Sequence, residues 1–312
     1  MGNQTKAQVS KLLTTVSNKY TIDNAIAEQV LPVLKVKQST GIIGGYGKGH
    51  LRQEDDLMGG QAEARRATPT EYDLTQGYKI QNHGLQGVVT PDDVENVEEP
   101  FDAEVDTTED LSSLILVNKE LFCKNTIMNP AVVTQGVTLA GNDKFSDAVN
   151  SDPLGVAKDA AIETLDGCGR TYNACIMSEK TYQNLKYHPQ ILERLGFAMA
   201  RAGLLSKEDI MRAFDLKYLY VGEAAYNTAK EGQTAVLSQM WGAEMLFYYR
   251  PEAAAKKQVS FGYYLQRMDS TARKVFKAPL INPPESTSII VQDLYDYRVV
   301  NAKAGYLVQG TY

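Results

Sequence analysis

The stretch GIIGGYGKGHLRQEDDLMGG, residues 41–60, opens an unusual segment that runs to about residue 89. Glycines and polar residues dominate this segment, and large aliphatic residues are few. We expect two extended arms, residues 42–52 and 72–81, joined by a polar connection. A segment of this composition buries too little apolar surface to hold itself together, so it must lie against something else. Its length, about fifty residues, exceeds that of an ordinary loop and needs a structural reason.

A long helix is predicted downstream of this segment, over residues 107–127. Its apolar residues keep near-helical spacing, Thr107 is a suitable N-cap, and Asn129-Pro130 ends the pattern. Upstream of the segment, residues 5–30 are predicted to be helical in two pieces, of which the second has the weaker apolar stripe, and residues 33–36 are predicted to be extended.

The remainder of the chain mixes helices and strands, which places the protein in the α+β class. Asp152-Pro153 supplies an N-cap followed by proline at the first helical position, a common helix start. Helices are predicted over residues 152–167, 178–185, 190–203 and 206–214. Strands are predicted over residues 172–177, 218–221, 235–239, 243–249, 259–264, 289–300 and 304–309.

Charge is unevenly distributed along the chain. Residues 80–118 contain no Lys or Arg but hold a dense run of Asp and Glu from residue 92 to residue 110. Four cations precede this acidic run, namely Lys48, Arg52, Arg65 and Arg66. The acidic run is either a solvated face or one half of an electrostatic contact with a neighbouring chain.

Motifs that would indicate chemistry are not found. Gly44 to Gly49 resembles a phosphate-binding loop, but Ile42 and Gly49 occupy positions where that loop needs Gly and Ser or Thr. The three histidines, His50, His83 and His188, lack metal-ligand spacing, and no GxSxG nucleophile motif occurs. Cys123, Cys168 and Cys175 are predicted to be buried, reduced thiols. We therefore assign no catalytic, cofactor or metal residues and do not expect an enzyme.

Composition narrows the class of protein further. Hydrophobic residues make up 43% of the 312, enough for a sizeable core, and no apolar run reaches the length of a membrane helix. A net charge of -6 argues against a dedicated nucleic-acid binder, because that role needs clustered Lys and Arg. It leaves open a wall that faces packed DNA without binding it strongly.

The order of these parts resembles the tailed-phage major capsid proteins of the HK97 fold. An arm, a long glycine-rich hairpin, one long helix, a domain of helices and strands and a closing strand follow each other in that family. Several stretches also resemble sequence motifs that recur in the family: residues 30–36, 46–52, 139–153, 172–178, 185–189, 221–227 and 297–301.

The resemblance implies a division of the chain and a role. Residues 1–40 would form the N-terminal arm, 41–90 the extended loop over a neighbour, and 91–130 the peripheral domain with its spine helix. Residues 131–245 would form the axial domain, and 246–312 would return to the peripheral domain. Such a protein self-assembles through hexamers and pentamers into the icosahedral shell around phage double-stranded DNA.

The implied location is the virion, after assembly in the host cytoplasm. Implied partners are further copies of the chain, a portal, an optional decoration protein and packaged DNA faced non-specifically; no membrane and no cofactor are implied. A separate scaffolding protein is expected, because the chain is too short for the cleaved scaffolding segment of some relatives. The Lys–Asn cross-link of the type member cannot be aligned here.

The resemblance to capsid proteins implies a role for the uneven distribution of charge along the chain. We predict that Lys48, Arg52, Arg65 and Arg66 contact acidic residues of a neighbouring subunit, namely Asp92, Asp93, Glu98, Glu99, Asp102 and Glu104. Three other interpretations remain: an encapsulin-like compartment shell, which the long loop disfavours, a tail or portal component, and an α/β enzyme with an unrecognised site. A pocket with converging titratable groups would favour the enzyme.

Overall fold

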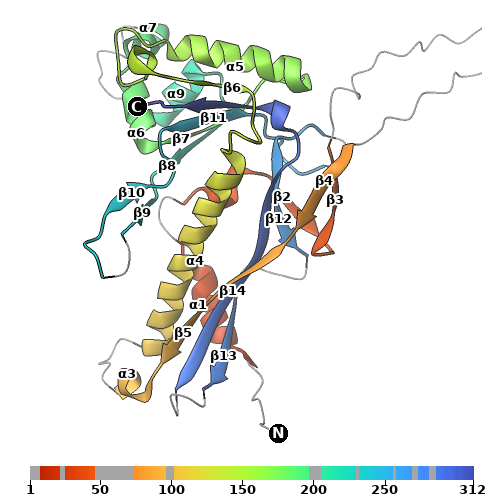
Figure 1. Cartoon of the computed structure of the whole chain (residues 1–312), viewed down its shortest axis with the longest axis vertical. Helices are drawn as coiled ribbons and strands as arrows, with labels where there is room; N and C mark the ends of the chain where they lie inside the picture. Colours follow the sequence, from red (N-terminus) through yellow and green to blue (C-terminus); the bar gives the residue numbers. More distant parts are fainter. Residues whose placement is uncertain are drawn as a thin grey trace, which may run out of the picture.

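The protein is elongated and consists of two stacked modules (Figure 1). The computed structural model describes residues 8–21, 25–45, 73–95, 102–196, 205–229, 232–255, 258–268, 273–280 and 286–312. We call the modules the six-stranded module and the five-stranded module after their sheets. The six-stranded module forms the lower part of Figure 1, and the five-stranded module with its helices forms the top.

One long strand, β14 (Thr287–Val299), organises the six-stranded sheet. Strand β5 (Gln81–Val89) pairs with residues 287–295 along one edge of β14. Along the other edge, β13 (Lys274–Pro279) and β12 (Gly262–Arg267) pair end to end with its first and second halves. Strand β1 (Gln8–Val9) extends the sheet beside β13, and β2 (Val33–Val36) runs parallel to β12.

Helix α4 (Ala103–Ile127) packs across β14 and β5 and corresponds to the long helix predicted over residues 107–127. Its start differs from the prediction. Asp102, and not Thr107, is the N-cap, because the Asp102 carboxylate accepts hydrogen bonds from the free amides of Glu104 and Val105. Thr107 lies inside the helix, where its hydroxyl bonds the Ala103 carbonyl.

Two short N-terminal helices flank α4. Helix α1 (Lys11–Lys19), capped by Ser10, lies against α4 with the Ser17 and Ser112 hydroxyls 2.7 Å apart. Helix α2 (Ala27–Val30) follows. Helix α3 (Pro91–Glu95) precedes α4 at the narrow end of the module. The two predicted N-terminal helical pieces are therefore present but shorter than expected.

The five-stranded sheet has the order β6-β15-β11-β7-β8. These strands are β6 (Gly136–Thr138), β15 (Gly305–Gln309), β11 (Glu244–Tyr248), β7 (Ala174–Ser178) and β8 (Tyr218–Gly222). Four helices pack on one face of it: α5 (Pro153–Cys168), α6 (Glu179–Lys186), α7 (Pro189–Leu195) and α9 (Lys207–Ala213). Short 3₁₀ turns occupy Gly141–Asp143 (η2) and Ala302–Ala304 (η3).

Residues 246–312, expected to return to the peripheral domain, divide between the two sheets. Strands β12, β13 and β14 lie in the six-stranded sheet, whereas residues 246–248 of β11 and all of β15 lie in the five-stranded sheet. Helix α7 ends at Leu195, because Gly196 adopts a φ of 94° that glycine favours; the rest of the predicted helix, to residue 203, lies outside the described residues.

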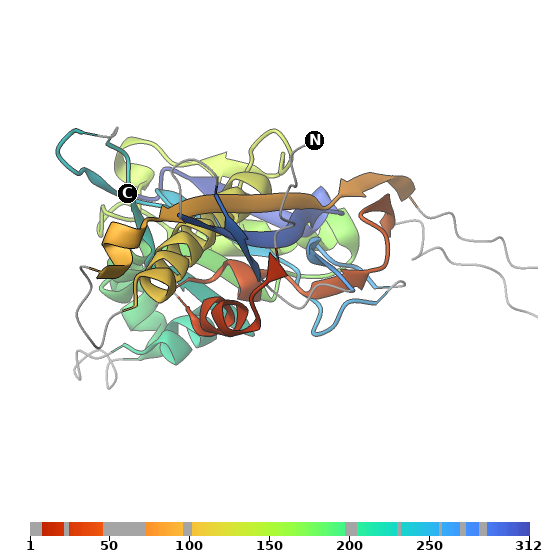
Figure 2. The ribbon, with the colours of Figure 1, turned by 90° about the horizontal axis from the view of Figure 1, so that it is seen from below.

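The glycine-rich segment divides between two locations. Strands β3 (Thr40–Gly45) and β4 (Asp73–Lys79) form a separate hairpin that projects from the body, as Figure 2 shows, and residues 46–72 lie outside the described part. Residues 81–89, predicted as part of the extended loop, instead form β5 in the sheet of their own chain. Gly87 allows α4 to pack closely on β5, since a Cβ there would meet the Thr107 side chain at 2.7 Å.

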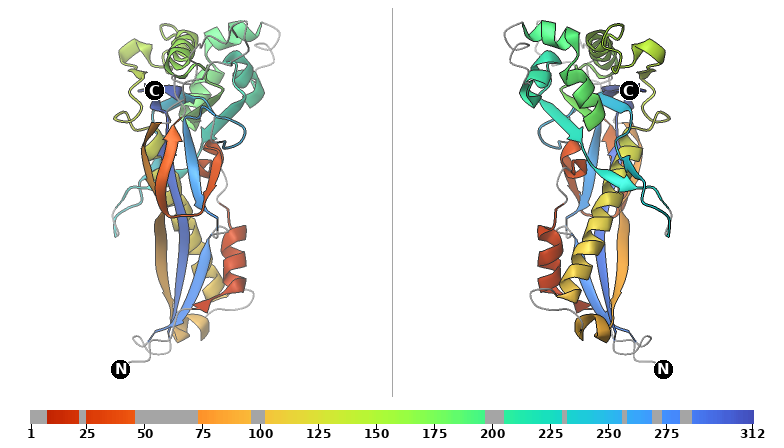
Figure 3. Two further views of the ribbon diagram at one scale, coloured as in Figure 1. Left: turned by 90° about the vertical axis from the view of Figure 1, so that its right-hand side faces the viewer. Right: turned by 90° about the vertical axis from the view of Figure 1, so that its left-hand side faces the viewer.

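A second hairpin leaves the five-stranded module on another side. Strands β9 (Ala225–Asn227) and β10 (Leu237–Gln239) pair only with each other among the described strands. Figure 3 shows them projecting beside α4. A two-stranded ribbon of this kind is marginally stable by itself.

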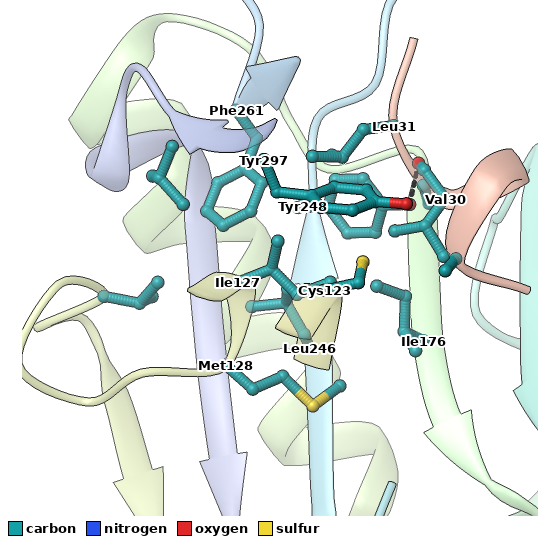
Figure 4. Close-up of a cluster of buried hydrophobic side chains, with 14 of the residues drawn as sticks. Val30, Leu31, Cys123, Ile127, Met128, Ile176, Leu246, Tyr248, Phe261 and Tyr297 are labelled. Atoms are coloured by element: carbon teal, nitrogen blue, oxygen red, sulfur yellow. Dashed lines mark hydrogen bonds between the residues drawn. The ribbon is translucent and has the colours of Figure 1, made fainter. Parts of the chain in front are cut away.

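The modules share one apolar core (Figure 4). Cys123 and Ile127 at the end of α4 meet Ile176 and Leu246 from the five-stranded sheet. The Tyr248 hydroxyl crosses this core to donate a 2.6 Å hydrogen bond to the Val30 carbonyl. All three cysteines are buried and form no disulfide, as the sequence predicts. Because the core is continuous, the two sheets cannot separate without exposing it to water.

Gly222 at the end of β8 tests this packing. A Cβ at that position would lie 2.0 Å from the ring of Trp241, which is fully buried. We expect Gly222→Ala to lower the free energy of unfolding by about 1–3 kcal/mol through overpacking. Trp241 is the only tryptophan of the chain, so displacement of its ring would shift the fluorescence emission.

The matched control is Gly77→Ala in β4, where the nearest atom lies 3.9 Å from the added Cβ. An unchanged melting temperature and emission spectrum in Gly222→Ala would contradict the close packing of Trp241.

Candidate functional site

A buried ammonium group lies where α2, α4 and β14 meet. Lys119 on α4 keeps only 3% of its side chain exposed. Its Nζ lies 2.6 Å from Glu28 Oε1 on α2 and 3.0 Å from Asp293 Oδ2 on β14. The rings of Tyr264 and Tyr295 lie 5.0 and 4.8 Å from the same nitrogen, at cation–π distance.

These neighbours keep Lys119 charged. Burial alone would lower the pKa of Lys119, but Tyr264, Asp293 and Glu28 outweigh burial and raise the pKa above its ordinary value. The ammonium therefore joins three elements by charge–charge contacts. Its contact with Asp293 is buried, whereas the Glu28 side chain is 58% exposed, so water screens the Glu28 contact more strongly.

The next residue, Glu120, forms a second junction with different chemistry. Its two carboxylate oxygens accept hydrogen bonds from the backbone amides of Ile26 and Ala27, at 2.9 and 2.8 Å. Trp241 Nε1 donates a third bond at 3.1 Å. Burial raises the pKa of Glu120, and these three hydrogen bonds oppose that rise. Glu120 thus ties the N-terminal segment and the five-stranded module to the same turn of α4.

A polar cavity of about 490 Å³ adjoins both junctions. Lys119, Glu120, Glu28, Asp293 and Arg273 contribute charge to its wall. Arg273 is 7% exposed and donates one hydrogen bond, 2.7 Å long, to the Tyr20 carbonyl, while its Nη1 has no partner. Two cations therefore face three carboxylates across the cavity. A further anion would not be favoured there, and the groups are already engaged in structural contacts.

The described residues bring together no constellation typical of catalysis. Among them, no three His, Cys, Asp or Glu side chains lie close enough to hold a metal ion. The buried thiols of Cys123 and Cys175 have pKa values raised by burial, which makes them poor nucleophiles. None of the helices described combines the length and apolar character needed to cross a membrane.

The predicted contact residues fall into two groups. Lys48, Arg52, Arg65, Arg66, Glu98 and Glu99 lie outside the described residues. Asp92 and Asp93 are exposed on α3, where the Asp93 carboxylate accepts hydrogen bonds from the amide and hydroxyl of Thr90. These bonds lower the pKa of Asp93.

The other two acidic residues have partners within the chain. Asp102 caps α4, and Glu104 forms an ion pair with Lys277 on β13. Their carboxylates are therefore partly committed to the fold. The predicted pairing across a subunit boundary stays a prediction.

Lys119, Glu120 and Asp293 were not identified from the sequence. A signal for the first two was present, because the buried face of α4 includes Ile115, Leu116, Cys123 and Ile127 at helical spacing. Lys119 and Glu120 fall on that same face, so charged residues in the apolar stripe marked a buried polar contact.

Sequence comparison places this arrangement among known proteins. No protein-family model matches the chain. The major capsid protein of Burkholderia phage BcepMu is 25% identical over 318 aligned residues, covering 99% of both chains. The major capsid protein of Pseudomonas phage JBD67 is 28% identical over 261 aligned residues, covering 80% of both. The chain is a relative of phage major capsid proteins.

Structural comparison gives the same fold. A phage-related protein from Bordetella bronchiseptica RB50 matches with a TM-score of 0.74 and 20% identity, covering 98% of both chains. The capsid of cyanophage P-SCSP1u matches with a TM-score of 0.57 and 10% identity, covering 91% of this chain and 88% of that one. The predicted capsid resemblance is confirmed, and this relative of the major capsid proteins has their mixed fold of helices and strands.

The Lys119 junction predicts a large stability effect. Lys119→Met should lower the free energy of unfolding by about 3–5 kcal/mol, because it removes the cation that lies 3.0 Å from the buried Asp293 carboxylate. Asp293→Asn in the same chain should recover part of the loss, since it removes that carboxylate's charge. Chemical denaturation measures both changes.

Lys11→Met on the exposed face of α1 is the control and should change the free energy by less than about 0.5 kcal/mol. Equal losses in the single and double Lys119 variants would show that packing, and not charge, dominates at this junction.

His83 on β5 predicts a pH dependence. Its ring stacks on Tyr295 with centroids 4.2 Å apart, and burial lowers its pKa below the ordinary 6.5. As pH falls below about 6.5, the unfolded chain takes up a proton that the folded chain resists, so stability declines. We expect His83→Phe, which keeps a stacked ring, to lose less stability than the unsubstituted chain between pH 6.5 and 5.

The test compares the pH dependence of the free energy of unfolding in the His83→Phe chain with that in the unsubstituted chain, because other groups also titrate in this range. Glu120 and Asp296 have raised pKa values and act in the opposite direction, while His188 acts in the same direction. All three remain in both chains. Identical slopes would show that His83 titrates normally in the fold.

Proposed function

We propose that this chain is the major capsid protein of a tailed phage. Copies of it would assemble through hexamers and pentamers into an icosahedral shell around double-stranded DNA. The observation that carries the proposal is the likeness to the major capsid protein of phage BcepMu over 99% of the chain, together with a capsid fold. A shell subunit acts through contacts with copies of itself. This agrees with a cavity whose charged groups already make contacts within the chain, and with two hairpins that project from the body.

The division of labour follows the shape of the chain. The six-stranded module with α4 as its spine would be the peripheral domain, and the five-stranded module would be the axial domain. The β3/β4 hairpin would carry the extended loop onto a neighbour. A scaffolding protein, a portal and, optionally, a decoration protein would complete the virion after assembly in the host cytoplasm.

Charge would direct the loop to its neighbour. Lys48, Arg52, Arg65 and Arg66 lie in a loop sequence, while the narrow end of the six-stranded module exposes the acidic α3. A single exposed ion pair contributes only about 0.2–1 kcal/mol. The contact would therefore rely on repetition around each capsomer and on the apolar area buried with it.

Electron microscopy of the purified protein, expressed with and without a scaffolding protein, tests the assembly role. Closed particles, or rings of five and six subunits, are expected. Arg65→Glu with Arg66→Glu should reduce particle yield, and Glu98→Lys with Glu99→Lys in the same chain should restore part of it. A monodisperse monomer or dimer of the unsubstituted chain under both conditions would contradict the capsid role.

The control is Lys11→Glu with Lys19→Glu on α1, which makes the same change in net charge at exposed positions. Unchanged particle yield in the arginine variant would reject the loop contact while leaving the capsid role intact.

A further inference from the structure

The two edges of the five-stranded sheet carry different surfaces. Strand β8 forms one edge and β6 the other, and no further described strand pairs with either of them there. Figure 1 shows β8 on the lower side of the module and α5, near β6, along its upper side. A contact between these two surfaces can form only between separate copies of the chain.

The surface at the β8 edge consists of two stacked tyrosine rings and an arginine. Tyr218 and Tyr220 are stacked with centroids 6.4 Å apart and an interplanar angle of 9°. The Arg250 guanidinium lies 4.7 Å from the centre of the Tyr218 ring. All three side chains are partly buried, and we call them the aromatic edge.

Arg250 is the unsatisfied member of the aromatic edge. No carboxylate of the described residues lies within ion-pair distance of it, and its Nε is buried without a hydrogen-bond partner. The neighbouring Lys217 differs, because it pairs with Glu252. Tyrosine and arginine held rigid at a partly desolvated site are the residues that most often dominate protein interfaces.

The surface near the β6 edge is an apolar pair surrounded by carboxylates. Ile162 and Leu165, on the outer side of α5, are 48% and 49% exposed. Glu163 and Asp166 alternate with them, and neither carboxylate has an ion-pair partner in the described part of the chain. The Gln135 side chain, just before β6, bonds the Glu163 carbonyl and holds α5 beside that edge. We call these four residues the α5 face.

We propose that the aromatic edge of one copy docks on the α5 face of the next copy. The charges are complementary, since an unpaired guanidinium would meet two unpaired carboxylates. The tyrosine rings would cover the exposed Ile162 and Leu165. Because the two surfaces differ and lie at opposite edges of one sheet, the contact is head-to-tail, and its repetition generates a ring when the rotation between copies closes. The inference rests on the proposed capsid role and assigns residues to the contact between neighbouring subunits.

Single-stranded nucleic acid is the competing occupant, because stacked tyrosines with an arginine can also receive bases. The aromatic edge offers one unpaired cation, whereas nucleic-acid grooves follow the phosphates with several. The chain as a whole carries a net charge of -6. A second copy of the chain therefore fits the surface better.

A charge exchange tests the contact in the full chain. Arg250→Glu, and separately Glu163→Lys with Asp166→Lys, should each reduce the fraction of protein in rings and particles at least ~10-fold. The chain that carries all three substitutions should recover most of the assembled fraction. Sedimentation velocity and electron microscopy measure assembly, and melting temperatures confirm that each variant is folded. Lys207→Glu, an exposed charge reversal in the first turn of α9, is the control.

Each outcome decides between the alternatives. Recovery in the combined variant supports a direct contact, and loss without recovery overturns it. Assembly of every variant at the unsubstituted yield overturns this contact alone. If the unsubstituted chain forms no rings or particles, the capsid role fails as well. If Arg250→Glu abolishes binding to a single-stranded DNA oligonucleotide while assembly is unchanged, the aromatic edge is a nucleic-acid site and the contact is rejected.

Discussion

The ion cluster around Lys119 is the constraint on which the arrangement of the molecule depends. An ammonium group can be buried only where opposite charges and hydrogen bonds replace its water, and here they come from elements far apart in the chain. Glu28 belongs to the N-terminal segment, Asp293 to the central strand and Lys119 to the long helix. Any displacement of one element relative to the others leaves a buried charge uncompensated, so the three positions are fixed together.

Glu120 extends this constraint to the second module. Its carboxylate receives two backbone amides of the N-terminal segment and the indole of Trp241, which leads into the five-stranded sheet. One turn of α4 therefore holds charge contacts on one side and hydrogen bonds to both modules on the other. Polar contacts of this kind are directional, and they specify an orientation that apolar packing alone would leave less well defined.

Local features of the fold could be predicted from the sequence, and non-local pairings could not. The helix start at Asp152-Pro153 and the capped helices after Ser178 and Ser206 follow from hydrogen bonds within a few residues, and these are present. The start of α4 was misplaced because Asp102 and Thr107 are both acceptable caps, and only the structure shows which one receives the amides. Strand β5 was assigned to the loop because its glycines and polar residues carry no strand signal without β14 beside them.

The same reasoning applies to the candidate site. Short apolar runs predicted the existence of β11 and β15, but a strand buried on both faces gives no sign of which sheet it joins. Lys119 and Glu120 were passed over because charged residues are usually solvated. Their position on the apolar face of α4 outweighs that expectation, and burial of a charge then requires a partner. That the partners are Glu28, Asp293 and two backbone amides depends on tertiary structure alone.

The pairing of β5 with β14 has a consequence for how the protein is made. Its partners lie roughly 200 positions apart in the chain, a separation that slows the formation of a sheet. During synthesis, β5 and α4 leave the ribosome long before β14 exists, and the helix face that β14 will cover stays open in the meantime. The five-stranded module faces a similar delay, because β15 follows later still. A nascent chain with such late closing strands is vulnerable to aggregation, so chaperones that shield apolar surface should matter more for its yield than its final stability would suggest.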